Sequence, residues 1–325
     1  MKKMVLASLF LVFAVIILGA YTRLTDAGLG CPDWPGCYGH YSVPKQAAHV
    51  AAAEQAFPHR PIEPHKARNE MVHRYFAGAL GLLILGIFVV SLLNRKPMRP
   101  LKLPLLLVIL VCFQAALGMW TVTLNLMPLV VMGHLLGGFS ILACLYLLHL
   151  RLSGFRIPGG DPHVRKLAKF TLIGLFIVIG QIALGGWTSA NYAALACTEL
   201  PVCEPGWWQK LDFIGAFSIP SAENYEFGVH DYGERMTMHI MHRAGALVTF
   251  IYLCWLASKL YRVAHTDTFK NQAIVLVLVL GLQVALGISN VVFSLPVAIA
   301  VMHNAVGACL LMVMVLINYT LFRKA

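Results

Sequence analysis

The sequence contains few charged residues. Only 12% of its 325 residues are Asp, Glu, Lys or Arg, whereas a soluble domain has about 25%. Acidic residues are the scarcer kind, with 14 Asp and Glu against 25 Lys and Arg. The chain also lacks a polar segment long enough for a separate soluble domain, because its only long polar segments are residues 23–70 and 191–235. These shortages exclude an ordinary soluble globular protein.

Long apolar runs take up most of the chain instead. Apolar residues make up 59% of the sequence, and the mean hydropathy is +0.74. A helix that crosses a bilayer needs roughly 20 mostly apolar residues, and eight stretches meet this requirement. We therefore predict an all-α integral membrane protein with eight transmembrane helices, at residues 4–22, 71–93, 103–122, 129–150, 168–190, 236–258, 271–292 and 297–321.

The net charge of +11 would suit a nucleic-acid-binding protein, but its distribution indicates a membrane topology. If residue 1 is cytoplasmic, the cytoplasmic segments hold 16 of the 25 basic residues and only two acidic ones, Asp161 and Asp267. Such an excess of Lys and Arg is typical of cytoplasmic loops. We expect cytoplasmic N- and C-termini, two long outer segments, membrane lipid around the helices and no nucleic-acid partner.

The two halves of the chain resemble each other. Residues 19–37 match residues 185–203 at an offset of 166, including two cysteines in each segment. Farther along the chain, matching positions lie 169 residues apart. This repeat predicts two four-helix bundles of parallel topology, residues 1–160 and 161–325. It also argues against the alternative of a cleaved signal peptide over residues 1–22, which would have no later counterpart.

Four histidines lie at matched positions within the apolar stretches. In each half, 61 residues separate two histidines near the outer ends of spans that run in the same direction. Imidazoles from facing helices can ligate a haem iron from both sides. The alternatives are hydrogen bonds between helices and a zinc site, which needs three or four protein ligands. Four matched ionisable residues within a membrane favour haem; the pairs are His73 with His134 and His242 with His303.

An arginine follows the first histidine of each pair. Arg74 and Arg243 suit haem propionates, because a guanidinium group binds a carboxylate through two hydrogen bonds. An equally weighted alternative is an interfacial side chain that extends its charge toward water.

The halves differ three residues before that histidine. Glu70 occupies this position in the first half and His239 in the second, and a spacing of three places each on the same helix face as the histidine. A carboxylate beside only one haem suggests that the first site performs chemistry and the second holds a redox cofactor. The alternative is an ordinary acidic residue at a helix N-terminus.

Four of the eight cysteines lie in the outer segments. They form two pairs, each with five residues between its members: Cys31 and Cys37, and Cys197 and Cys203. Because the outer compartment is oxidising, we expect a disulfide in each pair, with thiols that exchange during turnover as the alternative. The other four cysteines lie singly in spans, where they act as small apolar residues.

The motif Gln-x-Ala-Leu-Gly occurs three times, at Gln114, Gln181 and Gln283. Its glycine allows close helix packing, and its glutamine suits a hydrogen bond between helices. The first outer segment contains four more histidines, which we interpret as solvated loop residues rather than metal ligands: His40, His49, His59 and His65.

In combination, these motifs resemble the bacterial haem A synthases. Residues 22–37 are similar to the first outer loop of that family, and Glu70-x-x-His73-Arg74 resembles its next motif. The doubled four-helix unit and the second cysteine pair extend the similarity over essentially the whole chain. Residues 38–69 form a long, histidine-rich segment to which no family role is carried over.

The resemblance implies an oxidoreductase of the bacterial inner membrane that serves cytochrome oxidase. In this family the C8 methyl group of haem O is converted to the formyl group of haem A by successive hydroxylations. The resemblance implies substrate haem between His73 and His134, a haem b cofactor between His242 and His303, and a requirement for Glu70 in turnover. It also implies a disulfide in each long loop and haem sites toward the periplasmic side. The expected partners are haem O, the farnesyltransferase that forms it and an unidentified redox protein.

Two other functions stay open at this point. A di-haem b-type electron-transfer protein usually places its haems at opposite membrane depths, whereas all four histidines here are expected near one face. A haem transporter explains the histidines but not the difference between Glu70 and His239.

Overall fold

The computed structural model describes residues 1–93, 100–154, 157 and 160–323. Eight of the helices found there are long and apolar enough to cross a membrane, which confirms the number expected from hydropathy. The same residues contain no β-strand. In chain order the long helices are α1 (Lys2–Leu24), α3 (Pro64–Leu93), α4 (Lys102–Thr123), α5 (Pro128–Ser153), α6 (Ala168–Ala190), α8 (Tyr232–Val263), α9 (Asp267–Val292) and α10 (Val297–Arg323).

Two helices begin well before the apolar run that predicts them. α3 begins at Pro64, seven residues before the expected start, and α8 begins at Tyr232, four residues before it. The additional turns are polar, so a hydropathy pattern does not detect them. At α8 the start is stabilised by Glu234, which accepts a hydrogen bond from the backbone N–H of Asp231 at 2.9 Å, as in a capping box.

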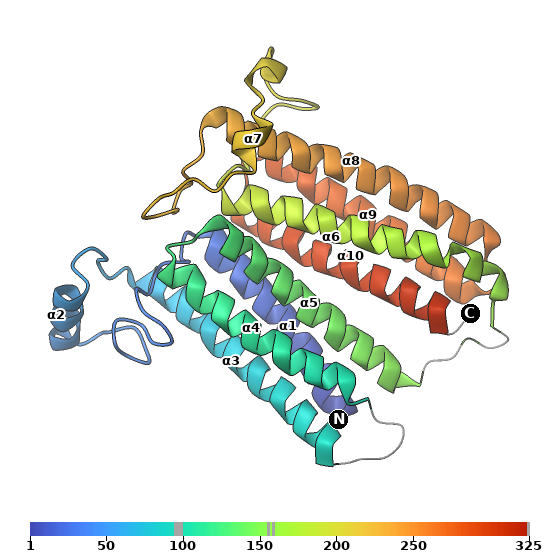
Figure 1. The fold of residues 1–325 in the computed structure, drawn as a ribbon, viewed down its shortest axis with the longest axis horizontal. Helices are drawn as coiled ribbons and strands as arrows, with labels where there is room; N and C mark the ends of the chain where they lie inside the picture. The colour runs from blue at the N-terminus through green and yellow to red at the C-terminus, as the bar shows by residue number, and fades with distance from the viewer. Residues whose placement is uncertain (94–99, 155–156, 158–159, 324–325) are drawn as a thin grey trace. The chain divides into compact units, whose positions relative to one another are not determined.

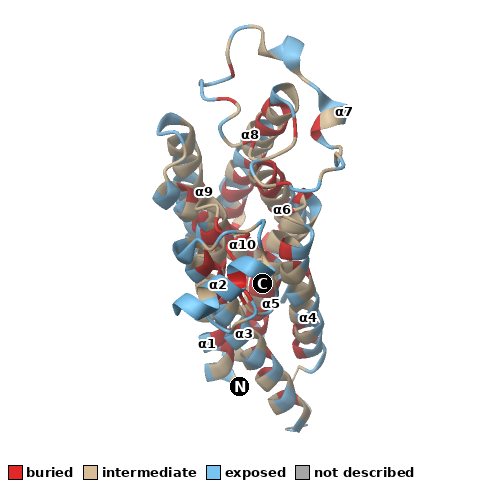
Figure 2. Ribbon diagram, turned by 90° about the vertical axis from the view of Figure 1, so that its left-hand side faces the viewer, coloured by how far each residue is buried: buried red, intermediate tan, exposed pale blue. Residues whose placement is uncertain are grey.

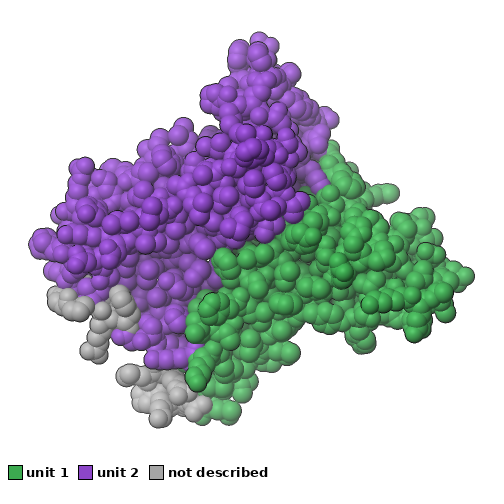
Figure 3. Space-filling model, turned by 180° about the vertical axis from the view of Figure 1, so that it is seen from behind, with its two compact units in different colours: residues 1, 3–141, 219–229 green, residues 2, 142–218, 230–325 purple. Residues whose placement is uncertain are grey.

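The chain divides into two compact units (Figure 3). Unit 1 comprises residues 1, 3–141 and 219–229, and unit 2 comprises residues 2, 142–218 and 230–325. Unit 1 therefore contains α1, α3, α4 and the first half of α5. Unit 2 contains the end of α5 together with α6, α8, α9 and α10. The division into residues 1–160 and 161–325 stays a prediction.

In unit 1, α1, α3, α4 and the first half of α5 run alongside one another (Figure 1). α1 and α3 approach closely, since a Cβ atom at Gly86 would lie 3.0 Å from the Met4 side chain. The segment between α1 and α3 contains the short helix α2 (Ala47–Ala56). Part of this segment packs against α3 through a small apolar core that includes Cys31 and Tyr38.

In unit 2, four long helices form a closed ring of contacts. α6 packs against α8, α8 against α9, α9 against α10, and α10 against α6 (Figure 1), which is a four-helix bundle. Leu253, Phe269 and Met314 are completely buried there. Polar groups inside the bundle bond to each other, as Asn318 and Thr171 do at 3.0 and 3.1 Å. The outer segment before α8 contains the short helix α7 (Phe213–Ala216).

Exposed residues recur along the outer faces of the long helices (Figure 2), and many of them have large apolar side chains. Leu82 is 73% exposed, Phe176 64% and Leu278 66%. Monomeric soluble proteins rarely expose contiguous apolar surface of this extent. In a bilayer, lipid covers such faces while the helices satisfy their own backbone hydrogen bonds. The chain is therefore a multi-pass membrane protein.

Candidate functional site

Two histidines of unit 1 meet between α3 and α5. His73 lies nine residues after the start of α3, and His134 lies six residues after the start of α5. Their ring centres are 6.4 Å apart, and the ring planes are inclined at 74° to each other. The two residues that are 61 positions apart in sequence are therefore neighbours in space.

The separation of these rings fits one metal ion between them. A ring nitrogen binds a metal ion at about 2 Å, so two imidazoles on opposite sides of one ion have ring centres about 6 Å apart. The Nδ1 atom of His73 is buried without a hydrogen-bond partner. In the described part of the chain, no three His, Cys, Asp or Glu side chains are grouped to hold a metal. The donor set therefore fits haem, whose iron needs two protein ligands.

Unit 2 contains the second pair, His242 on α8 and His303 on α10. His242 lies ten residues after the start of its helix, and His303 lies six residues after the start of its own. The two side chains lie near each other, and Nδ1 of His303 is buried without a partner. The same kind of donor set thus occurs in both units.

Glu70 lies inside α3 rather than at its beginning. Six residues of helix precede it, and α3 has no acidic residue in its first turn, so the alternative of a helix N-terminal acid is wrong. Glu70 is only 5% exposed. One carboxylate oxygen accepts the backbone N–H of Cys31 at 2.9 Å, and the other pairs with the guanidinium group of Arg74. The buried carboxylate therefore joins the first outer loop to α3.

The two arginines bind the cysteine-containing loops. Arg74 donates to three backbone carbonyls within residues 33–36, and Arg243 donates to three within residues 197–201. Two acceptors in one loop, residues 33 and 35, correspond to residues 199 and 201 in the other at the offset of 166. In this structure the guanidinium groups, which we expected at propionates or at the interface, fix each loop to its helix.

A disulfide closes each of these loops. Cys31 is linked to Cys37 with Cα atoms 4.8 Å apart, and Cys197 is linked to Cys203 with Cα atoms 5.1 Å apart. The remaining four cysteines are free thiols in the long helices. Each disulfide packs in a small apolar cluster with residues of the helix that carries the first histidine of its pair, α3 for the first and α8 for the second.

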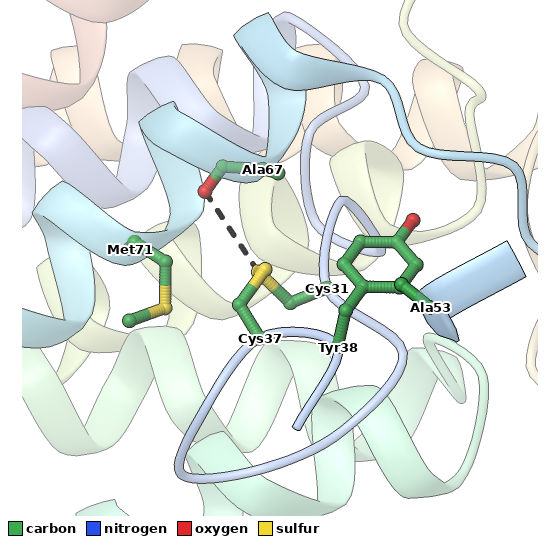
Figure 4. Packing of buried hydrophobic residues seen from close by; sticks show 6 residues of the cluster. All are labelled: Cys31, Cys37, Tyr38, Ala53, Ala67 and Met71. Carbon is green, nitrogen blue, oxygen red and sulfur yellow. Dashed lines mark hydrogen bonds between the residues drawn. A yellow bond between two sulfur atoms is a disulfide. The ribbon is translucent and has the colours of Figure 1, made fainter. Parts of the chain in front are cut away.

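The first disulfide lies in a small apolar core (Figure 4). Cys31 and Cys37 are completely buried beside Tyr38, and Sγ of Cys31 lies 3.8 Å from the carbonyl oxygen of Ala67. Burial raises the pKa of Tyr38, and its hydroxyl donates to the carbonyl of Pro61 at 3.1 Å. The loop is thus folded onto the turn of α3 that precedes the buried carboxylate.

His239 occupies the position in unit 2 that corresponds to Glu70. It is 4% exposed, it hydrogen-bonds with the backbone of Ala193, and its Nδ1 atom has no partner. Among the described residues, Arg243 forms no ion pair with a carboxylate. A buried carboxylate–guanidinium pair is therefore present beside the first histidine pair and not beside the second.

Sequence reasoning anticipated hydrogen bonds from three glutamines but not their partners. Each glutamine contacts one of the paired histidines: Gln114 with His134, Gln181 with His242 and Gln283 with His303. The spacing of the motif could have predicted these partners. Its glycine lies one helical turn after the glutamine, on the same helix face, and lies against the same histidine.

The histidines of the first outer segment are separate from these sites. His40 and His49 stack on each other with ring centres 4.6 Å apart. The described residues contain no group of three metal-ligating side chains, and the interpretation of these histidines as solvated loop residues stays a prediction.

The helical fold and the two histidine pairs define a class, that of multi-pass membrane proteins with paired histidines between their helices. A family model described as COX15-CtaA, cytochrome oxidase assembly protein, matches residues 2–315. The chain belongs to this family, whose members include haem A synthases.

Several relatives are similar over nearly their whole length. The haem A synthase of Shewanella oneidensis is 55% identical over 313 residues, which cover 96% of this chain and 93% of that protein. The haem A synthase of Chelativorans sp. is 26% identical over 92% of this chain and 84% of its own. That of Rickettsia prowazekii is 25% identical over 98% and 96%. The similarity is therefore not confined to the histidine or cysteine motifs.

Proposed function

We propose that this protein is a haem A synthase, a membrane enzyme that oxidises the C8 methyl group of haem O to a formyl group. The observation that carries the proposal is the pairing of His73 and His134 inside unit 1, in a chain 55% identical to a haem A synthase. Family membership indicates the class of reaction, and the histidine pair offers a place for the iron of the substrate.

The two histidine pairs are proposed to have different roles. Substrate haem O would bind between His73 and His134, and a haem b cofactor would bind between His242 and His303. When bound, the cofactor supplies one-electron redox chemistry. The buried, unpartnered ring nitrogens in both units support these assignments. Glu70 is the reason for assigning chemistry to the first pair, because only that pair has a carboxylate one helical turn away.

The reaction places oxygen on an unactivated carbon twice. The first hydroxylation gives a hydroxymethyl group, the second gives a gem-diol, and loss of water leaves the aldehyde. Each hydroxylation is a two-electron oxidation of this carbon. With water as the source of oxygen, two protons leave the site and two electrons pass to the unidentified redox partner. We propose that Glu70 accepts protons or stabilises positive charge that develops near the substrate. Its burial beside His73 supports this role.

The ion pair with Arg74 affects how Glu70 would act. A carboxylate that takes up a proton loses most of its attraction to the guanidinium group. Arg74 also donates to three loop carbonyls, so the loop stays attached to α3 when the carboxylate is protonated. The loop that contacts Glu70 therefore stays in place whether or not the carboxylate is charged.

We further propose that both termini are cytoplasmic and that the histidine pairs lie toward the periplasmic face of the inner membrane. The distribution of basic residues supports this orientation. Lys2 and Lys3 lie at the start of α1, Lys102 at the start of α4 and Arg151 near the end of α5. Five other basic residues that support this topology lie outside the described residues: Arg95, Lys96, Arg99, Arg156 and Lys324.

The two halves are proposed to be copies of one four-helix bundle. Backbone conformation supports this, because residues with positive φ recur at the same offsets as the sequence motifs. Residues other than glycine rarely adopt positive φ, so recurrence at matched positions is specific. The matched pairs are Asp26 with Tyr192, Asn125 with Ser294, and Leu126 with Leu295.

The proposal is tested by expressing the protein with a supply of haem O and identifying the porphyrins extracted from it. Hydroxylated or formylated haem is the expected result. Haem b alone would indicate a di-haem electron carrier, and unmodified haem O would indicate a transporter; either result overturns the proposal. His73→Ala is the matched control, because it should retain haem b in unit 2 and form no product.

A further inference from the structure

A glycine on a neighbouring helix lies against each of the four paired histidines. In every case a Cβ atom at the glycine would come within 3.2 Å of Cε1 of the imidazole ring, so a larger residue would displace the ring. The pairs are Gly19 with His73 (3.0 Å), Gly118 with His134 (3.2 Å), Gly185 with His242 (2.9 Å) and Gly287 with His303 (3.1 Å).

Three of these glycines are preceded by a glutamine, one helical turn earlier, that contacts the same histidine. Gln114 donates to the backbone carbonyl of His134 at 2.7 Å, and its Nε2 atom lies 3.1 Å from Nδ1 of that ring. The histidine is therefore held between a carboxamide and a glycine. A glutamine and a glycine that contact the same histidine are called here a Gln–Gly pair, and two more occur in unit 2. Nε2 of Gln181 lies 3.0 Å from Nδ1 of His242 and donates to the carbonyl of His242 at 3.0 Å. Nε2 of Gln283 lies 3.3 Å from the other ring nitrogen, Nε2, of His303.

His73 lacks this glutamine. Val15 stands four residues before Gly19, and the ring of His73 hydrogen-bonds with the backbone of Val15 instead. Its Nδ1 atom is buried without a partner. In the first histidine pair, a glutamine therefore positions the ring of His134, whereas no glutamine positions the ring of His73.

We propose that the three glutamines are positioning residues for iron-ligating histidines, and that Val15 makes His73 the ligand that yields when substrate porphyrin enters and leaves. This inference rests on the proposed function, because it assigns iron to the histidines. A cofactor has to keep both ligands, whereas a substrate has to exchange at every turnover. Two Gln–Gly pairs in unit 2 and one in unit 1 match that difference.

The glutamines have an unused acceptor beside each ring. The Oε1 atoms of Gln114, Gln181 and Gln283 are all buried without a partner, which is costly for a polar atom in an apolar surrounding. A histidine that binds iron through one ring nitrogen carries its proton on the other nitrogen, which then needs an acceptor. Rotation of the carboxamide about its last bond supplies one. Loss of such a partner typically lowers metal affinity by about 10–100-fold.

The cofactor site is tested with Gln283→Leu, by measuring the rate at which haem b leaves the purified protein for an apo-globin acceptor. We expect loss that is faster by about 10–100-fold, together with a changed low-spin electron paramagnetic resonance spectrum. Gln272→Leu is the matched control, because Gln272 lies in the same helix but hydrogen-bonds to Thr320 at 3.0 Å. Gln283→Glu keeps an oxygen acceptor, so it should keep haem and lower the reduction potential.

The substrate site is tested with Val15→Gln, which places a glutamine four residues before Gly19. Release of haem O from the purified, substrate-loaded protein should slow, while haem b in unit 2 is unaffected. Ala14→Gln introduces the same side chain at the adjacent position and should leave the release rate unchanged. Gln114→Val provides a second variant, because it removes the Gln–Gly pair at His134 and should speed release of haem O.

The outcomes separate this inference from the proposed function. Wild-type protein that binds no haem would overturn both. Wild-type protein that binds haem, with equal haem loss from Gln283→Leu and Gln272→Leu, would overturn the positioning role alone. Unchanged release of haem O in both Val15→Gln and Gln114→Val would overturn the assignment of His73 as the exchangeable ligand.

Discussion

Replacement of Glu70 by glutamine removes one buried negative charge and keeps the size of the side chain. The carboxamide oxygen can still accept the N–H of Cys31, which lies 2.9 Å from the carboxylate. The contact with Arg74 changes from an ion pair to two donor groups that face each other. Because Arg74 keeps its backbone acceptors in the loop, its charge is not left without partners, and the variant should fold.

The size of the effect distinguishes two roles of Glu70. If the carboxylate accepts protons in the reaction, its loss should slow turnover by about 10²–10⁴-fold, which corresponds to about 3–5 kcal/mol in the activation free energy. If it only joins the loop to α3, the variant should lose stability and yield while each folded molecule keeps its activity. The quantity to measure is therefore haem A formed per mole of haem-loaded enzyme.

Arg74→Lys is the matched control for Glu70→Gln. It keeps the carboxylate and a positive charge but loses the several hydrogen bonds that the guanidinium group makes to the loop. We expect Glu70→Gln to lose haem A formation and Arg74→Lys to lower yield with little change in turnover. Near-normal turnover of Glu70→Gln would falsify the proton-accepting role, and equal losses in both variants would show that Glu70 acts through the loop. His239→Ala should be mild; if it stopped turnover with haem b still bound, the roles of the two units would be reversed.

Three further predictions concern topology, the cofactor and the cysteines. A reporter fused to the C-terminus should be cytoplasmic and one inserted near Ser221 external, and both on one side would contradict the eight-span topology. His242→Ala and His303→Ala should each abolish the low-spin haem b spectrum of the purified protein, whereas a wild-type spectrum in both would exclude these ligands. Non-reducing mass spectrometry should find both cysteine pairs linked; alkylation of all four thiols before reduction would show that neither disulfide forms.

The long helices could be predicted from sequence because crossing a bilayer requires an uninterrupted apolar run of nearly fixed length. The same reasoning did not find the first turns of α3 and α8, where the helix continues into polar residues. It also did not find α2 and α7, which lie in the polar outer segments. Hydropathy detects the part of a helix that contacts lipid, and the remaining turns depend on capping and on contacts with the loops.

The site was predictable where it depends on helix geometry. Both halves have two histidines 61 residues apart, near the outer ends of helices that run in the same direction. This pattern predicts that His73 and His134 are neighbours, and their ring centres are 6.4 Å apart. The partners of Glu70 could not be obtained in this way. Cys31 is 39 residues distant in sequence, and its contact with Glu70 depends on how the irregular first loop folds back onto α3. The importance of Val15 could not be predicted from the motif either. Gln-x-Ala-Leu-Gly identifies the three places where a glutamine stands four residues before the glycine, but not the fourth place, where a valine replaces it.

The two arginines make similar contacts in both units, so they do not explain why only one site would perform chemistry. Arg74 and Arg243 hold the carbonyls of a disulfide loop in the same way, so neither the arginine nor the disulfide alone gives one site a chemistry that the other lacks. The difference lies in what else contacts the loop. In unit 1 the N–H of Cys31 donates to Glu70, and this donor is the backbone of a residue that forms the disulfide. Any change in the conformation of that loop therefore changes the surroundings of the carboxylate, whereas in unit 2 the corresponding position has a histidine that contacts the backbone of Ala193.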